Sequence, residues 1–187
     1  MSLKRIKLVF YGKMSVGKTR LSSYITSQQN VFIDKGPTIG IEYSSKFDYN
    51  NNTKVIVWDL SGDPKFNTLY NEYFKIADII LYVYDISNHN DISFLDMVIF
   101  LEKYQHKNVY VIGNKIDLVE SVDHLQSIID FTNEKCIPHF LVSAKDKTNI
   151  SCLLENIVDP SARICDPLIS RYTQPVIDNT CCLCAIS

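Results

Sequence analysis

The sequence has no marked excess of charge of either sign and no long hydrophobic run. Its 187 residues include 19 lysines and arginines against 21 aspartates and glutamates, which gives a formal net charge of −2. That balance argues against a dedicated nucleic-acid-binding protein, because such proteins usually carry a marked positive excess. The longest apolar run, Ile79–Tyr84 with its neighbours, is far shorter than the roughly 20 residues that cross a bilayer.

The chain also lacks the features of an exported protein. Only Leu8–Tyr11 follows the first basic residues, whereas a secretory signal needs an apolar stretch of about 7–15 residues. We therefore expect the protein to be made, and to stay, in the cytosol. Three of its cysteines stand singly, at Cys136, Cys152 and Cys165, and in a reducing compartment we expect them to be buried or half-buried thiols.

Hydrophobic residues alternate between strand-like and helix-like patterns. Apolar runs predict strands at Ile6–Tyr11, Lys54–Trp58, Ile79–Tyr84, Val109–Ile112 and Phe140–Val142. Glu42–Tyr49 alternates in polarity and predicts the partner of Lys54–Trp58 in the only antiparallel hairpin. Helical patterns fall around residues 20–28, 94–101, 122–129 and 150–158. The alternation predicts a three-layer α/β fold with a mostly parallel six-stranded sheet and about five helices.

The length and the end of this pattern define the expected domain organisation. A chain of 187 residues with 46% hydrophobic and 21% charged residues is suited to one globular domain, and is neither disordered, collagen-like nor coiled-coil in composition. The alternation stops after about Arg163. We therefore expect one domain over residues 1–163 and a flexible tail over 164–187.

A Walker A pattern lies between the first predicted strand and the first predicted helix: Gly12-Lys13-Met14-Ser15-Val16-Gly17-Lys18-Thr19. In that setting the backbone N–H groups of the loop surround phosphate oxygens, and the helix N-terminus adds its positive end. Lys18 would reach the β- and γ-phosphates, and the Thr19 hydroxyl would bind Mg²⁺. The alternative, a glycine turn with a surface lysine, is disfavoured by the strand–loop–helix setting.

A second motif follows the predicted strand Val109–Ile112 and reads Asn114-Lys115-Ile116-Asp117. The Asp117 carboxylate can accept hydrogen bonds from N1–H and the 2-amino group of guanine, neither of which adenine offers. Sites built on such bonds reject the wrong ligand by about 10⁴–10⁵-fold, which speaks against the alternative of a P-loop kinase that uses ATP. Ser143-Ala144-Lys145, after the last strand, can place the Ala144 N–H on the guanine carbonyl.

Two further segments supply groups for the metal ion and the terminal phosphate. Asp59-Leu60-Ser61-Gly62 follows the strand Lys54–Trp58, so that Asp59 would hold Mg²⁺ through a water and the Gly62 N–H would meet the γ-phosphate. Thr38, within Pro37-Thr38-Ile39-Gly40, can supply a second hydroxyl to Mg²⁺.

In this order the motifs resemble those of the Ras superfamily of small GTPases, over roughly residues 4–160. The detail is similar to the Rab branch: Thr38-Ile39-Gly40-Ile41-Glu42-Tyr43, then Trp58-Asp59, with Phe66 and Tyr73 in the second switch. The resemblance implies a P-loop NTPase (G-domain) fold, GTP and GDP as ligands, Mg²⁺ as cofactor, and a membrane-associated switch in vesicle trafficking. It implies an effector-facing group of Ile41, Tyr43, Trp58 and Tyr73, with core packing as the alternative for Trp58.

The resemblance further implies a monomer with three kinds of regulatory partner: an exchange factor, a GTPase-activating protein and effectors. Prenylation machinery would be a fourth partner, and nucleic acid none. Catalysis of GTP hydrolysis would fall to Lys18, Gly62 and the residue after that glycine, Asp63.

Two departures from the family pattern bear on hydrolysis. Asp63 stands where the family has a glutamine that orients the attacking water; an ionised carboxylate is shorter, cannot donate, and adds negative charge beside the γ-phosphate. Met14 replaces a small residue, and its bulk would hinder an arginine finger worth about 10³–10⁵ in rate. We therefore expect weak hydrolysis, with a permanently GTP-loaded scaffold as the alternative. The aromatic against the guanine is assigned to Phe32, although Val31 is the strict match in register.

The last residues, Cys184-Ala185-Ile186-Ser187, form a C-a-a-X ending, in which serine favours farnesyl over geranylgeranyl. One lipid binds membranes only marginally, and the tail has no basic patch, so Cys181 and Cys182 are the natural acylation candidates. A metal site or free thiols would be the alternative, which the lack of a nearby histidine disfavours. We expect a protein anchored to the cytosolic face of a membrane by a C-terminal lipid.

Overall fold

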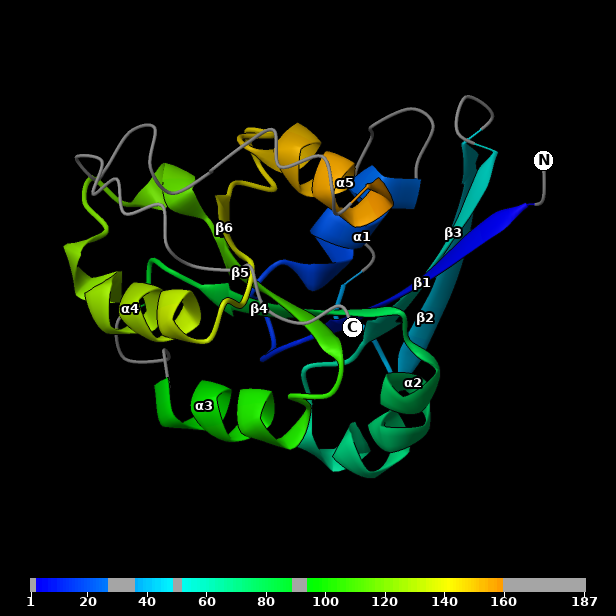
Figure 1. Cartoon of the computed structure of the whole chain (residues 1–187), viewed down its shortest axis with the longest axis horizontal. Coiled ribbons are helices and arrows are strands. Elements are labelled where there is room, and N and C mark those ends of the chain that lie inside the picture. The colour runs from blue at the N-terminus through cyan, green and yellow to red at the C-terminus, as the bar shows by residue number, and fades with distance from the viewer. Residues whose placement is uncertain (1–2, 27–35, 49–51, 89–93, 160–187) are drawn as a thin grey trace, which may run out of the picture.

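The computed structural model describes residues 3–26, 36–48, 52–88 and 94–159. Its centre is a six-stranded sheet in the order β2-β3-β1-β4-β5-β6 (Figure 1). The strands are β1 (Lys4–Tyr11), β2 (Ile41–Asp48), β3 (Thr53–Leu60), β4 (Ile79–Asp85), β5 (Asn108–Asn114) and β6 (His139–Val142). Only β2 runs antiparallel to its neighbour, and the other pairs are parallel. The predicted α/β class, the mostly parallel sheet and the single hairpin are therefore confirmed in the described parts.

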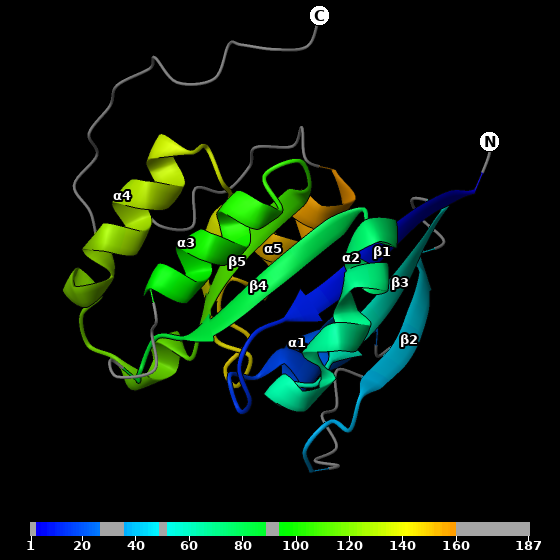
Figure 2. The same cartoon turned by 90° about the horizontal axis from the view of Figure 1, so that it is seen from below.

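Helices cover both faces of the sheet and make the outer layers of the fold. They are α1 (Lys18–Thr26), α2 (Tyr70–Ile76), α3 (Phe94–Lys103), α4 (Gln126–Glu134) and α5 (Ile150–Val158). Helices α1 and α5 lie on one face, and α2, α3 and α4 lie together on the other, which is nearest the viewer in Figure 2. This arrangement leaves the carboxyl ends of the parallel strands uncovered, where open α/β sheets bind ligands.

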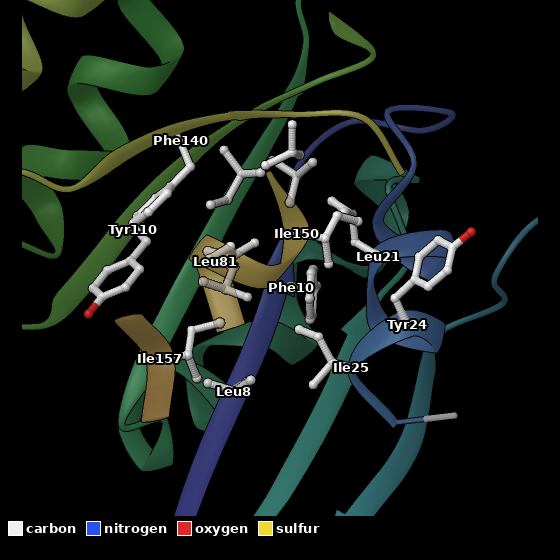
Figure 3. Close-up of a cluster of buried hydrophobic side chains, with 14 of the residues drawn as sticks. Leu8, Phe10, Leu21, Tyr24, Ile25, Leu81, Tyr110, Phe140, Ile150 and Ile157 are labelled. Atoms are coloured by element: carbon white, nitrogen blue, oxygen red, sulfur yellow. The ribbon is translucent and has the colours of Figure 1, made fainter. Parts of the chain in front are cut away.

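Two hydrophobic cores fill the spaces between these layers. The core under α1 and α5 includes Leu8, Phe10, Leu21, Leu81 and Ile157 (Figure 3). The opposite core is rich in aromatic side chains from α2, α3 and the strands beneath them. Strand residues of β1 alternate between the two, because successive side chains point to opposite faces.

The structure differs from the predicted elements in two places. Residues 64–76 form a 3₁₀ helix, Pro64–Leu69, followed by α2, although the sequence there shows no clear periodic pattern. The expected helix around 122–129 begins as a short 3₁₀ turn, Asp123–Leu125, and continues as α4 to Glu134. The expected tail boundary near residue 163 lies outside the described residues.

Of the single cysteines, Cys152 is buried as expected, but Cys136 is exposed, so that part of the prediction is wrong. Cys136 stands in the turn between α4 and β6 with a left-handed φ of 52°, and such a turn runs over the surface. Cys165 lies outside the described residues. Among the helices that the structure describes, none has the length and hydrophobicity needed to cross a membrane.

A buried histidine links β6 to β4 and α4. The His139 Nε2 atom lies 2.9 Å from the Tyr84 hydroxyl, and Nδ1 lies 3.3 Å from Thr132 Oγ1. The Thr132 hydroxyl donates to carbonyls of its own helix, so a neutral imidazole with its hydrogen on Nδ1 satisfies all three side chains. Burial lowers the pKa of His139 from 6.5 to about 3.

This histidine predicts an acid-sensitive component of stability. Below pH 6.5 the His139 imidazole binds a proton in the unfolded chain, whereas in the folded chain it stays neutral down to about pH 3. Stability is therefore full above 6.5 and falls by about 1.4 kcal/mol per pH unit between these values. Between pH 6.5 and 4.5, urea unfolding should show wild type losing about 2 kcal/mol more than His139→Gln. Parallel pH profiles for the two proteins would contradict this assignment.

Candidate nucleotide-binding site

The predicted motifs meet at one pocket of about 520 Å³ at the carboxyl edge of the sheet. Its walls come from the loop before α1, from residues 36–38, from Ser61 and Gly62 after β3, and from the loops after β5 and β6. Met14, Ser15, Gly17, Lys18, Thr19, Thr38, Asn114, Lys115, Asp117, Ala144 and Lys145 all line it. Motifs that are far apart in the sequence therefore share one cavity.

The Walker A loop holds the Lys18 ammonium with its own backbone carbonyls. Lys18 is 5% exposed, and its Nζ atom donates to the carbonyls of Gly12 at 2.8 Å and Lys13 at 2.7 Å. Burial lowers the pKa of the Lys18 ammonium to about 8, against the nearby Asp59 carboxylate, which raises it. Gly17 has a φ of +96°, and a Cβ there would lie 2.2 Å from Asn114 Nδ2, so only glycine lets the loop approach β5 this closely.

Three oxygen-bearing side chains lie together at the wall of the pocket, which Thr19 and Thr38 line and Asp59 does not. Thr19 Oγ1 lies 2.9 Å from Thr38 Oγ1 and donates to Asp59 Oδ2 at 2.5 Å. Burial raises the pKa of Asp59 to about 6, although the Thr19 hydrogen bond and the Lys18 charge lower it. Its Oδ1 atom is buried without a hydrogen-bond partner among the described residues. An orphaned carboxylate oxygen beside two hydroxyls fits the oxygen ligands that Mg²⁺ prefers.

Asn114 joins two of the loops that line the pocket. Its Nδ2 donates to the Val16 carbonyl at 2.7 Å, and its Oδ1 accepts from the Ala144 N–H at 3.0 Å. The Ala144 N–H, expected to face a guanine carbonyl, is thus engaged by Asn114 in this arrangement. The sheet brings the two groups together, because both sit at the ends of the neighbouring strands β5 and β6.

The Asp117 carboxylate is held in a defined orientation. Ser143 Oγ donates to its Oδ1 at 2.6 Å, and the Lys145 ammonium lies 3.6 Å from its Oδ2. Its side chain is only 7% exposed. Ser143 itself is fully buried and accepts from the N–H groups of Lys145 and Asp146. Ser143 therefore orients the Asp117 carboxylate but does not itself line the pocket.

Gly62 packs directly against the Walker A loop. A Cβ on Gly62 would lie 2.2 Å from the Met14 nitrogen and 2.4 Å from the Lys13 carbonyl carbon. No side chain fits between the two backbones at that distance. The Met14 side chain stands beside this contact and is 52% exposed, at the mouth of the same pocket.

Asp63 caps a short helix, a structural role that was not predicted from the sequence. It is the N-cap of the 3₁₀ helix that begins at Pro64, and its Oδ1 accepts from the Lys65 N–H at 3.1 Å. Its Oδ2 pairs with the Lys65 ammonium at 2.7 Å, and these interactions hold the pKa of Asp63 below its usual range. Asp63 does not line the pocket in the described part of the chain, unlike its neighbour Gly62.

The aromatic members of the expected effector-facing group form a chain of ring contacts across three elements. Tyr43 on β2 is 57% exposed, and its ring lies 6.4 Å from that of Trp58 on β3. The Trp58 ring in turn lies 5.8 Å from that of Tyr73 on α2. Ile41, Trp58 and Tyr73 also pack against the buried core, so surface and core roles coexist.

Several residues at the pocket were not predicted. Arg20, Gly36, Pro37 and Leu118 also line it. The sequence signal for Arg20 was its place two residues after the Walker A lysine, where a helical side chain leans toward the phosphate loop. Phe32, Val31 and the cysteines Cys181, Cys182 and Cys184 lie outside the described residues.

Comparison with known proteins agrees with this geometry. The model of the Ras family matches residues 7–162. Ras-related protein Rab-7B of Dictyostelium discoideum is 28% identical, over 96% of this chain and 98% of its own length. Rab-18 of Lymnaea stagnalis is 28% identical over 82% and 79% of the two chains, and Rab-11B of D. discoideum 31% over 81% and 71%. The chain therefore belongs to the Ras superfamily of small GTPases and is similar to the Rab proteins.

Proposed function

We propose that this protein is a Rab-like switch that binds GTP and GDP with Mg²⁺ at a membrane and acts in vesicle trafficking. One observation carries the proposal. Asp117, Lys18, Thr19 and Thr38 line one pocket, and Thr19 is in hydrogen-bond contact with Thr38 and donates to Asp59. A single guanine nucleotide would engage both Asp117 and the Thr19–Thr38–Asp59 group.

Each of these residues would bind a different part of the nucleotide or its metal ion. Asp117, held by Ser143, would accept the two guanine N–H donors, and Lys18 would exchange its loop carbonyls for phosphate oxygens. Thr19, Thr38 and Asp59 would hold Mg²⁺, which neutralises phosphate charge when bound. Thr38 and the Gly62 N–H belong to segments near residues 34–43 and 60–75, which would order around the γ-phosphate and relax without it.

We also propose that intrinsic hydrolysis is weak. The Asp63 carboxylate is committed to capping and to Lys65, so it is poorly disposed to orient water beside Gly62. Met14 adds bulk at the same mouth, where an arginine from an activating protein would enter. Both features favour a GTP-loaded resting state, with Lys18 and Gly62 left to support the reaction.

The same observation on Asp63 favours a second candidate function, a non-hydrolysing scaffold that stays loaded with GTP and recruits effectors. The exposed Tyr43 beside Trp58 and Tyr73 would serve effectors in either case. The two functions differ in turnover. An exchange factor and a GTPase-activating protein are required partners only for the switch.

The nucleotide carried by the purified protein tests these functions. Chromatography of the denatured protein, purified without added nucleotide and then incubated, should show bound GTP turning slowly into GDP for a switch and remaining GTP for a scaffold. Calorimetry on emptied protein should show uptake of GTP and GDP but not of ATP or ADP. Equal uptake of adenine and guanine nucleotides would overturn both candidates. Identical amide exchange in the GTP- and GDP-loaded forms would overturn the switch.

The membrane anchor remains a proposal based on the sequence of the tail. Cys184 would carry a farnesyl thioether, with Cys181 or Cys182 acylated as the second anchor that stable binding requires. The folded domain would then occupy residues 1–163 and the tail would tether it to the cytosolic face of a membrane. Intact-mass measurement of the C-terminal peptide from the native host should show both added lipids.

A further inference from the structure

Lys115 links the nucleotide pocket to a second cavity behind the Walker A loop. This second cavity, of about 260 Å³, is lined by the loop residues Lys13–Val16, by the end of β4 and by Met97 of α3. Lys115 lines both cavities. Asp85, the last residue of β4, lines only the second.

Asp85 holds the charged end of Lys115 on that far side. The Lys115 Nζ atom lies 2.6 Å from Asp85 Oδ2, and the two side chains are 30% and 14% exposed. Because the ammonium is fixed next to a residue outside the nucleotide pocket, it is the aliphatic stem of Lys115 that remains to form the pocket wall between Asn114 and Asp117.

The carboxylate is itself fixed, so it can act as an anchor. Asp85 Oδ1 accepts from the Ser87 N–H at 2.9 Å and from the Ser87 hydroxyl at 2.7 Å. Burial alone would raise the pKa of Asp85, but the hydrogen bonds from Lys115 and Ser87 outweigh it and lower the pKa. Strand register brings the pair together, because Asp85 lies opposite Asn114 in the β4–β5 ladder.

The backbone conformation at Lys115 gives its ion pair with Asp85 a second effect. Lys115 has a left-handed φ of 70°, a conformation that is strained for a residue with a side chain. It occurs between Asn114 and the 3₁₀ turn Ile116–Leu118, which carries Asp117. The ion pair between Lys115 and Asp85 therefore stabilises the turn that presents Asp117 to the pocket.

We propose that Asp85 is a positioning residue for the nucleotide, which fixes the Lys115 stem and the Asp117 turn and so slows nucleotide release. The inference rests on the proposed guanine-nucleotide site and adds a residue to it that does not touch the pocket. A charge-assisted hydrogen bond of this kind contributes enough that its loss should speed release about 10-fold. The factor should be the same for GDP and GTP, because the base end is common to both.

The test is the release rate of a fluorescent GDP analogue chased by excess GDP in the presence of Mg²⁺. Asp85→Asn keeps the shape but loses the charge and should release about 10-fold faster, whereas Asp85→Glu keeps the charge and should stay within about 3-fold of wild type. A role in packing alone would give the opposite order. Asp123→Asn, an exposed acid that lines neither cavity, is the matched control and should change nothing.

A double-mutant cycle links the effect to Lys115. Lys115→Met keeps an apolar stem without the ammonium, and Asp85→Asn/Lys115→Met should release GDP no faster than the faster single variant. Multiplying effects, or an unchanged Asp85→Asn, would overturn the role of Asp85 while leaving guanine binding intact. Failure of the wild type to bind any guanine nucleotide would instead overturn the proposed function.

Discussion

Asp117→Asn should weaken GDP binding by about 10⁴-fold. The variant should instead bind xanthosine diphosphate with an affinity comparable to that of the wild type for GDP. An asparagine amide cannot accept from both guanine donors, and its NH₂ group would oppose one of them. Xanthine carries a carbonyl in place of the 2-amino group, which that NH₂ can meet. The Ser143 hydroxyl, now 2.6 Å from the Asp117 carboxylate, can still donate to the remaining oxygen, so the side chain stays oriented.

The measurement is competition calorimetry with the two diphosphates on emptied protein. Ser143→Ala is the informative control, because it removes the donor that holds Asp117 in place without changing the acid. It should weaken both nucleotides about 10-fold and leave the preference for guanine intact. If Asp117→Asn kept its affinity for GDP, Asp117 would not be the residue that reads the base.

The strands and most of the site could be predicted because their signals are local. Continuous apolar runs such as Ile79–Tyr84 indicate strands buried on both faces, and in the structure all but one of these residues lie in the core. The phosphate loop and the segment Asn114–Asp117 follow such strands directly. Parallel strands bring their carboxyl ends to one edge, so motifs attached to those ends must meet.

Other features depend on register or on competition for a hydrogen bond, which no local pattern encodes. The Asp85–Lys115 pair exists because β4 and β5 align Asp85 with Asn114. The Ala144 N–H finds Asn114 Oδ1 within reach, which the sequence could not reveal. Asp63 is different, since an aspartate followed by Pro64 is a recognisable helix start that the functional interpretation of the position obscured.

Asp63→Gln should accelerate single-turnover GTP hydrolysis by about 100-fold, the scale of correct orientation in a reaction. Glutamine is longer, uncharged and able both to donate and to accept, and it is a poor helix cap. Its side chain would therefore leave the position that Asp63 takes over the Lys65 N–H and become free to reach water beside Gly62.

Asp63→Asn separates the two properties that change in this variant. Asparagine caps a helix as well as aspartate does, so it should remain on the Lys65 N–H while losing the ion pair at 2.7 Å. If capping and short reach keep residue 63 from the reaction, Asp63→Asn should hydrolyse GTP within about 3-fold of wild type. Equal acceleration by both variants would show that negative charge alone had slowed the wild type. No acceleration by Asp63→Gln would mean that residue 63 does not orient the attacking water, and if the wild type also showed no turnover, the non-hydrolysing scaffold would be the better description of this protein.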